Sequence, residues 1–142
     1  MTIIKIATND DIEKLIPLFK ELRPHRTDDD FRKLFPLLFK EGYHVAYLGN
    51  DQVAYAVIGF KIMTFLFSGK TLYVDDLSTL NGHQKKGYGG QLFQWAKKYA
   101  KDHHCDHFSL DSGLTRRDAH RLYPNQGLFV ESLHFGRKVE EF

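Results

Sequence analysis

Apolar residues recur at helical spacing in two segments near the start of the chain. The first apolar face, which Asn9 or Asp10 can cap, consists of Ile12, Leu15, Ile16, Phe19 and Leu22. The second, which follows aspartates at 28–30, consists of Phe31, Leu34, Phe35 and Leu38. Acidic side chains stabilise the positive end of a helix, which suits the aspartates at the start of the second segment. Together with the apolar spacing, this predicts two helices. They follow a short strand at residues 2–7, and Pro17 is expected to kink or restart the first helix.

Short runs of β-branched and aromatic residues replace this pattern in the middle of the chain. The predicted strands cover residues 44–48, 52–67 and 72–79. Turn residues at 49–51 and 68–70 separate them, and such short connections join strands that run antiparallel. We therefore expect three successive antiparallel strands.

One βαβ unit is predicted in residues 72–110. The helix that follows the strand at 72–79 carries Leu92, Phe93, Ala96, Tyr99 and Ala100 at helical spacing. A short strand is predicted next, at 108–110. Because a helical crossover returns the chain to the same end of the sheet, this strand should run parallel to the strand at 72–79.

The C-terminal part of the chain is predicted to add a short helix and two strands. The helix covers residues 115–123 and ends at Pro124, which cannot continue it. The strands cover 128–131 and 133–139, and the second, if exposed, is able to pair across a homodimer. The whole pattern predicts a mixed α/β fold around one sheet.

Length and charge place the chain among single-domain proteins. Its 142 residues are expected to form one domain, residues 1–142, with its own core. The 20 basic and 18 acidic residues leave a net charge of +2, which argues against a nucleic-acid partner and a polybasic membrane anchor. A single cysteine excludes an internal disulfide, and no apolar run resembles a signal peptide or the roughly 20 residues that span a bilayer. We therefore expect a cytoplasmic protein.

Two polar clusters suggest metal binding, and their spacing argues against it. The aspartates at 28–30 lack the spaced oxygen ligands and the glycine of a calcium loop. The adjacent residues His103, His104 and Cys105 cannot all point at one ion. We predict no metal site.

The glycine-rich turn before the helix has the chemistry of an anion site. The first amides of a helix lack intrahelical partners, and the helix dipole places partial positive charge there. Gly87, Gly89 and Gly90 let a phosphate approach the backbone closely, and Lys85 and Lys86 add positive charge beside it. A pyrophosphate is the expected ligand. Neither the dinucleotide fingerprint Gly-x-Gly-x-x-Gly nor a loop ending in Gly-Lys-Ser/Thr matches this stretch.

Two signatures in this order resemble those of the GNAT superfamily of acetyl-CoA-dependent N-acetyltransferases. Residues 84–89 fit the family's Gln/Arg-x-x-Gly-x-Gly/Ala motif. The residues that fit its second signature are Ala119, Leu122, Tyr123 and Gly127. The resemblance covers nearly the whole chain. It implies a GNAT-like acyl-CoA N-acyltransferase fold, in which helices flank a mostly antiparallel sheet with one parallel βαβ pair.

The resemblance also implies how acetyl-CoA, as co-substrate, is held. The backbone that would bind its pyrophosphate consists of Gln84, Lys85, Lys86, Gly87, Tyr88, Gly89 and Gly90. The pantetheine arm would pair with Leu77, Ser78 and Thr79 like an added strand. Arg116 stands where many members have Asn, and it contacts a coenzyme A phosphate or is ordinary surface charge.

Three side chains are candidates for the transfer itself. Tyr123 matches the family's tyrosine that protonates the leaving thiolate, and a phenol with a pKa of about 10 keeps that proton near neutral pH. Family members often carry an acidic residue on the strand at 72–79 that takes the amine proton directly or through water. Asp76 is the first candidate and Asp75 the second. Successive strand residues point to opposite faces unless a bulge intervenes, so only one is expected to face the site.

Two functions remain open on this evidence. The first is an N-acetyltransferase that acts on a primary amine of a small molecule or a peptide, with an acceptor pocket built from residues 23–27 and 132–135. The second is a catalytically silent acyl-CoA-binding sensor. Both functions need the phosphate loop. They differ in whether Tyr123 and Asp76 take part in a reaction.

Overall fold

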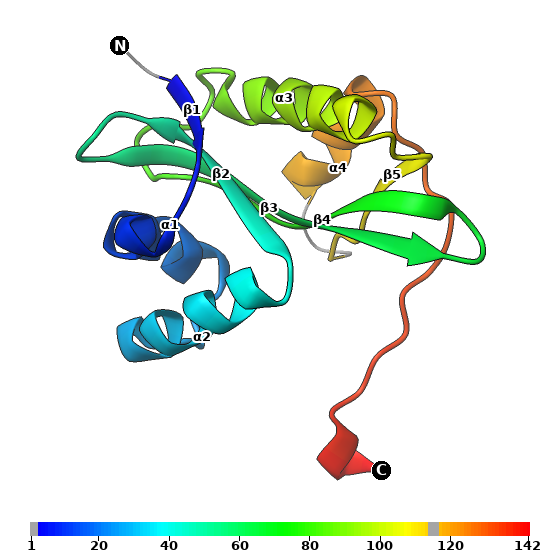
Figure 1. Cartoon of the computed structure of the whole chain (residues 1–142), viewed down its shortest axis with the longest axis horizontal. Helices are drawn as coiled ribbons and strands as arrows, with labels where there is room; N and C mark the ends of the chain where they lie inside the picture. Colours follow the sequence, from blue (N-terminus) through cyan, green and yellow to red (C-terminus); the bar gives the residue numbers. More distant parts are fainter. Residues whose placement is uncertain (1–2, 114–116) are drawn as a thin grey trace. The chain divides into compact units, whose positions relative to one another are not determined.

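A sheet is the centre of the first of two units into which the chain divides, Met1–Leu110 and Asp111–Phe142 (Figure 1). The computed structural model describes residues 3–113 and 117–142, without the side chains of 117 and 118. In this part of the chain the sheet has five strands, β1 (Ile3–Ile6), β2 (Tyr43–Gly49), β3 (Ala54–Phe65), β4 (Gly69–Thr79) and β5 (His107–Leu110), in the order β1-β2-β3-β4-β5. Neighbours run antiparallel except β4 and β5, which run parallel. The predicted mixed α/β fold is therefore confirmed.

Helices cover both faces of this sheet. The helical elements of the first unit are η1 (Asn9–Asp11), α1 (Ile12–Leu22), α2 (Asp28–Lys40) and α3 (Tyr88–Asp102). The helices α1 and α2 lie on one face and α3 on the other (Figure 1). Alternate residues of β2 divide between the two cores, because Val45 and Tyr47 pack with α1 and α2 whereas Ala46 and Leu48 pack with α3.

Local chemistry explains where the first helices begin. The hydroxyl of Thr8 caps η1, and the hydroxyl of Thr27 caps α2, each within a reciprocal capping box. Pro17 lies inside α1 without ending it, so the expected restart there is wrong. The first helix therefore runs on to Leu22 and presents Arg23 at its C-terminal end.

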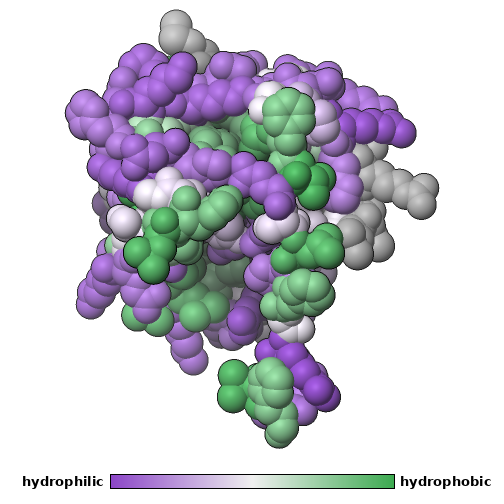
Figure 2. Space-filling view, turned by 90° about the vertical axis from the view of Figure 1, so that its right-hand side faces the viewer, coloured by the Kyte–Doolittle hydropathy of each residue, from purple (hydrophilic) through white to green (hydrophobic). Residues whose placement is uncertain are grey.

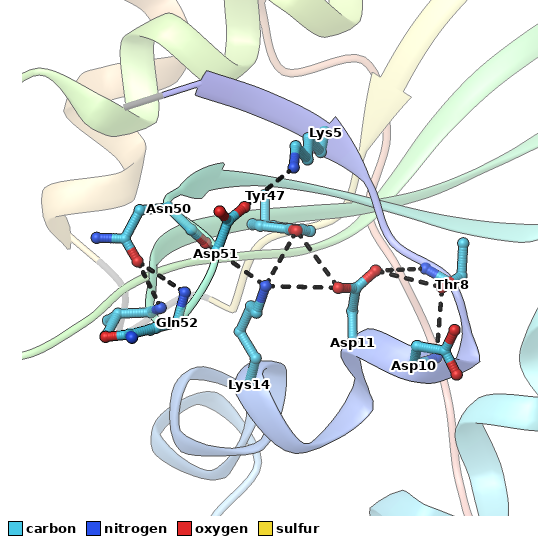
Figure 3. A network of polar contacts seen from close by, with 10 residues as sticks. Lys5, Thr8, Asp10, Asp11, Lys14, Tyr47, Asn50, Asp51 and Gln52 are labelled. Carbon is cyan, nitrogen blue, oxygen red and sulfur yellow. Dashed lines mark hydrogen bonds and ion pairs between the residues drawn. The ribbon is translucent and has the colours of Figure 1, made fainter. Parts of the chain in front are cut away.

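A polar network fastens the start of α1 to β2 (Figure 3). The Nζ atom of Lys14 lies 3.3 Å from the Tyr47 hydroxyl and 3.5 Å from Oδ1 of Asp11. The other carboxylate oxygen of Asp11 accepts from the Thr8 amide at 2.9 Å. Because these groups join the helix to the sheet at one end, the direction in which α1 carries Arg23 is well defined.

Several element boundaries differ from the prediction, and two of the differences have a local cause. The Asn50 side chain accepts from the amides of Gln52 and Val53, so β3 begins at Ala54 and not at Gln52. The helix α3 begins at Tyr88, four residues before the apolar pattern that starts at Leu92, because it incorporates two glycines.

The second unit contains α4 (Arg117–Asn125) and η2 (Val139–Glu141). Pro124 lies inside α4, so the expected end of the helix at this proline is slightly early. The strands predicted at 128–131 and 133–139 are wrong, because the described residues 117–142 contain no strand. The alternating pattern is present, but a strand needs a neighbour for its backbone groups, and no strand of the described residues pairs with this segment. The expected strand for pairing across a homodimer is likewise absent from the described segment.

The C-terminal segment exposes many of its large apolar side chains instead. These are Phe129, Val130, Leu133, Phe135, Val139 and Phe142. Apolar side chains of its last residues stand at the surface at the bottom of Figure 2. Among the helices of the described part of the chain, none is both long and apolar enough to cross a bilayer.

Candidate active site

A β-bulge in β4 determines where the two candidate carboxylates point. Asp76 pairs with Gly59 of β3, whereas the next residue of β3, Phe60, pairs with Val74, so Asp75 is the extra residue. As a result, Val74 packs in the core against α3, while Asp76 turns to the face covered by α1. Asp75 is exposed, and Asp76 is only 8% exposed.

Both oxygens of the Asp76 carboxylate are engaged. Its Oδ1 atom accepts from Arg23 through Nη2 at 2.8 Å and Nε at 3.2 Å. Its Oδ2 atom accepts from the Tyr43 hydroxyl at 2.5 Å. The same Nη2 atom of Arg23 also donates to the backbone oxygen of Asp75 at 3.2 Å. The end of α1 is therefore tied directly to the bulge of β4.

The absence of a side chain at Gly59 makes room for this arrangement. A Cβ atom there would lie 1.7 Å from the Tyr43 hydroxyl oxygen. Tyr43 is almost fully buried, and its burial together with the nearby Asp76 carboxylate raises its pKa well above the ordinary value. The phenol therefore stays protonated and donates to Asp76. Burial opposes the charge of Arg23, but the Asp76 carboxylate outweighs it and raises the pKa of the guanidinium, so Arg23 stays a cation.

Sequence reasoning did not identify this cluster. Arg23 was expected in the acceptor pocket, and neither its ion pair with Asp76 nor the role of Tyr43 was predicted. One signal was available. Gly59 interrupts the otherwise apolar strand β3, and a glycine inside a strand often marks a bulge or a close approach.

The glycine-rich loop ends in a helix start without a side-chain cap. Gly87 is the N-cap residue of α3 with a left-handed φ of 79°, and Lys85 is also left-handed at 62°. No side chain caps the first turn of α3, and no acidic residue lies in it. By contrast, α2 has a capping box and aspartates in its first turn. Lys85 and Lys86 are exposed beside the open amides, which is the donor set that a phosphate requires.

The end of β4 offers one edge of its backbone. On one side, Leu77, Ser78 and Thr79 pair with β3. On the other side, β5 pairs with β4 only as far as Val74, so within the first unit no strand continues beside these three residues. The Ser78 hydroxyl donates to the Leu18 carbonyl of α1 at 3.3 Å, which turns its side chain away from that edge. An extended ligand has a strand-like partner here.

The remaining candidates lie in or near the second unit. Tyr123 is half-buried on α4, and its backbone oxygen accepts from the amides of Gln126 and Leu128, both at 3.0 Å. Arg116 falls outside the described residues. No group of three His, Cys, Asp or Glu side chains in the described part of the chain is placed to hold a metal ion. The ring of His103 instead stacks on Tyr99 at 3.9 Å.

Comparison with known proteins identifies the family. The model of the acetyltransferase (GNAT) family matches residues 10–128. An uncharacterized N-acetyltransferase of Bacillus subtilis strain 168, YhdJ, is 28% identical over 137 residues, 95% of this chain and 96% of that protein.

Two solved structures share the fold. The aminoglycoside N-acetyltransferase AAC(6')-Iy in complex with CoA has a TM-score of 0.85 at 16% identity, with 98% of this chain and 95% of that chain covered. A GNAT family acetyltransferase of Staphylococcus aureus has a TM-score of 0.81 at 19% identity, with 97% and 98% covered. Since the family match includes the glycine-rich loop and the bulge of β4, the chain belongs to the GNAT family of acetyltransferases, enzymes that transfer acetyl groups from acetyl-CoA.

Proposed function

We propose that this enzyme transfers an acetyl group from acetyl-CoA to a primary amine of a small molecule or a peptide. The observation that carries the proposal is the uncapped start of α3, where Gly87 leaves the first-turn amides open beside Lys85 and Lys86. These groups would hold the pyrophosphate, and acetyl-CoA would supply the activated thioester. The free edge of β4 at residues 77–79 would bind the pantetheine arm.

Tyr123 is the proposed acid of the reaction. Attack of the neutral amine on the thioester carbonyl forms a carbon–nitrogen bond and breaks the carbon–sulfur bond, and the departing thiolate needs a proton. The phenol of Tyr123 would donate it. Arg116 is proposed as a further phosphate contact.

The two carboxylates of β4 have different proposed roles. The amine gains a positive charge on attack and must lose one proton to a base. Both oxygens of Asp76 already accept hydrogen bonds, and its side chain is nearly buried, so we assign it mainly the positioning of Arg23. Asp75, exposed at the bulge, is the group that would take the proton, through a water molecule.

Acetyl-CoA binding and thiol release test the proposal together. Calorimetric titration should show binding of acetyl-CoA, and a thiol-release screen over polyamines, aminoglycosides, amino acids and peptides should find an acceptor. Tyr123→Phe should lower kcat at least tenfold and leave the Kd for acetyl-CoA unchanged, since one proton donor contributes ~10²–10⁴-fold. Tyr99→Phe, which removes a phenolic hydroxyl far along α3, is the matched control and should keep both values.

Three results would contradict parts of this proposal. A wild-type protein that does not bind acetyl-CoA would refute the assigned site. Binding without thiol release for any amine would favour the alternative function, an acyl-CoA-binding sensor. Unchanged turnover in Tyr123→Phe would remove the tyrosine from the reaction.

A further inference from the structure

Three aromatic rings stack at the entrance to the glycine-rich loop. The ring of Tyr55, on β3, lies 4.6 Å from the ring of His83 with an interplanar angle of 28°. It also lies 6.1 Å from the ring of Tyr88 with an angle of 22°. These are the distances of stacked aromatic pairs. His83 directly precedes the loop at residues 84–90, and Tyr88 lies within it at the start of α3. One residue of the sheet therefore stacks on the residue that precedes the loop and on one inside it.

The position of Tyr55 is itself fixed by two hydrogen bonds. Its backbone oxygen accepts from the Leu80 amide at 2.8 Å, where the chain leaves β4. Its hydroxyl oxygen accepts from Nδ2 of Asn50 at 3.2 Å. Figure 3 shows how Asn50 in turn holds the backbone of the turn before β3, where its Oδ1 atom accepts from the Gln52 amide at 2.9 Å. The ring is therefore held against the loop by the sheet and by the preceding turn.

The loop has little of its own to hold its shape. Its residues from 84 to 87 are exposed, and it contains the left-handed residues Lys85 and Gly87. A left-handed non-glycine residue is conformationally costly and persists only when its surroundings hold it. The Nε2 atom of the Gln84 side chain donates to Oδ1 of Asn81 at 2.9 Å, but this contact stays within the same exposed turn. The stack on Tyr55 ties the loop to a buried strand instead.

We propose that Tyr55 is a positioning residue for coenzyme A. By stacking on both His83 and Tyr88, it holds the loop at two points so that the first amides of α3 face the pyrophosphate before the ligand arrives. Preorganisation of this kind increases affinity because less ordering has to occur on binding. The inference rests on the proposed phosphate site, and it adds a residue of β3 that does not touch the ligand.

Calorimetric titration with coenzyme A tests this role. Wild type is compared with Tyr55→Leu, which removes both stacked pairs, and with Tyr55→Phe, which keeps the ring and loses only the contact with Asn50. We expect Tyr55→Leu to raise the Kd about tenfold, since two stacked contacts are lost, and Tyr55→Phe to stay within about twofold of wild type. Thermal unfolding of each free variant shows whether it is folded.

Two further variants separate positioning from general destabilisation. Tyr99→Leu removes an aromatic ring that stacks on Trp95 and His103 near the other end of α3, and it should lower the melting temperature while the Kd stays unchanged. His83→Ala removes the partner of the 4.6 Å pair from the edge of the loop and should raise the Kd about threefold, even if Tyr55→Leu fails to fold.

The outcomes distinguish this inference from the proposed function. If wild type binds coenzyme A and both Tyr55→Leu and His83→Ala bind it equally well, Tyr55 has no positioning role. An equal loss of affinity in Tyr99→Leu would also overturn the inference, because the affinity for coenzyme A would then depend on the general stability of the protein and not on the position of Tyr55. If wild type itself does not bind coenzyme A, the proposed phosphate site fails, and this role fails with it.

Discussion

The ion pair between Arg23 and Asp76 should be measurable as a coupling energy in folding. Arg23→Met removes three hydrogen bonds, two to the Asp76 carboxylate and one to the backbone oxygen of Asp75, and leaves a nearly buried carboxylate with Tyr43 as its remaining partner. Breaking a fully buried pair in this way costs ~3–5 kcal/mol. The Arg23 side chain is 43% exposed and that of Asp76 9%, so water partly replaces the lost partner. We therefore expect a loss of about 2 kcal/mol in the free energy of unfolding, or about 6 °C in Tm.

A double-mutant cycle isolates the coupling energy between Arg23 and Asp76. Urea unfolding followed by circular dichroism is compared for wild type, Arg23→Met, Asp76→Asn and the double variant. Since Asp76→Asn removes the charge that Arg23 compensates, the double variant should lose about 1.5 kcal/mol less than the sum of the single losses. Arg26→Met, which changes a neighbouring exposed arginine, is the control and should show no coupling with Asp76→Asn. Additive losses within about 0.5 kcal/mol would refute the idea that this pair ties α1 to the bulge of β4.

Two further substitutions test the surroundings of the site. Gly59→Ala would place a Cβ atom 1.7 Å from the Tyr43 hydroxyl, so it should lower the free energy of unfolding, measured with urea, by at least about 3 kcal/mol. Gly136→Ala, whose Cβ atom would meet only ordinary contacts, is the control and should be neutral. A stable Gly59→Ala variant would contradict the packing described. Burial, and then the nearby charge of His103, lowers the pKa of His44 in the folded protein. Below about pH 6.5 the unfolded chain therefore binds more protons at His44 than the folded protein does. The stability that neutral His44 contributes above this pH is lost as the pH falls towards the pKa of His44 in the folded protein. Urea unfolding at pH 7.5, 6.5 and 5.5 should show a smaller loss of stability in His44→Gln than in wild type, and parallel curves would show that His44 is not involved.

The strand β4 shows how far local sequence can lead. The apolar pattern of residues 72–79 predicted a strand, and the two adjacent aspartates predicted that only one would face the inner side. Which one did so depended on a bulge opposite Gly59. The ladder between β3 and β4 decides that register, and the sequence of β4 alone does not contain it. The same pattern at 133–139 predicted a strand that does not form in the described single chain, because alternation supplies a suitable face but no partner for the backbone.

The sequence by itself predicted the helices, the three successive antiparallel strands, the parallel strand after α3 and the glycine-rich loop. These features depend on short-range periodicity and on the backbone freedom of residues that are contiguous in the chain, so they can be read locally. Only the tertiary structure decided that Arg23 and Tyr43 meet at Asp76, and that Tyr55 stacks on His83 and Tyr88. Arg23 and Asp76 are 53 positions apart, and Tyr43 and Asp76 are 33 apart. Their contact requires an unbroken α1, a bulge in β4 and a strand residue without a side chain, three conditions that only the packed fold brings together.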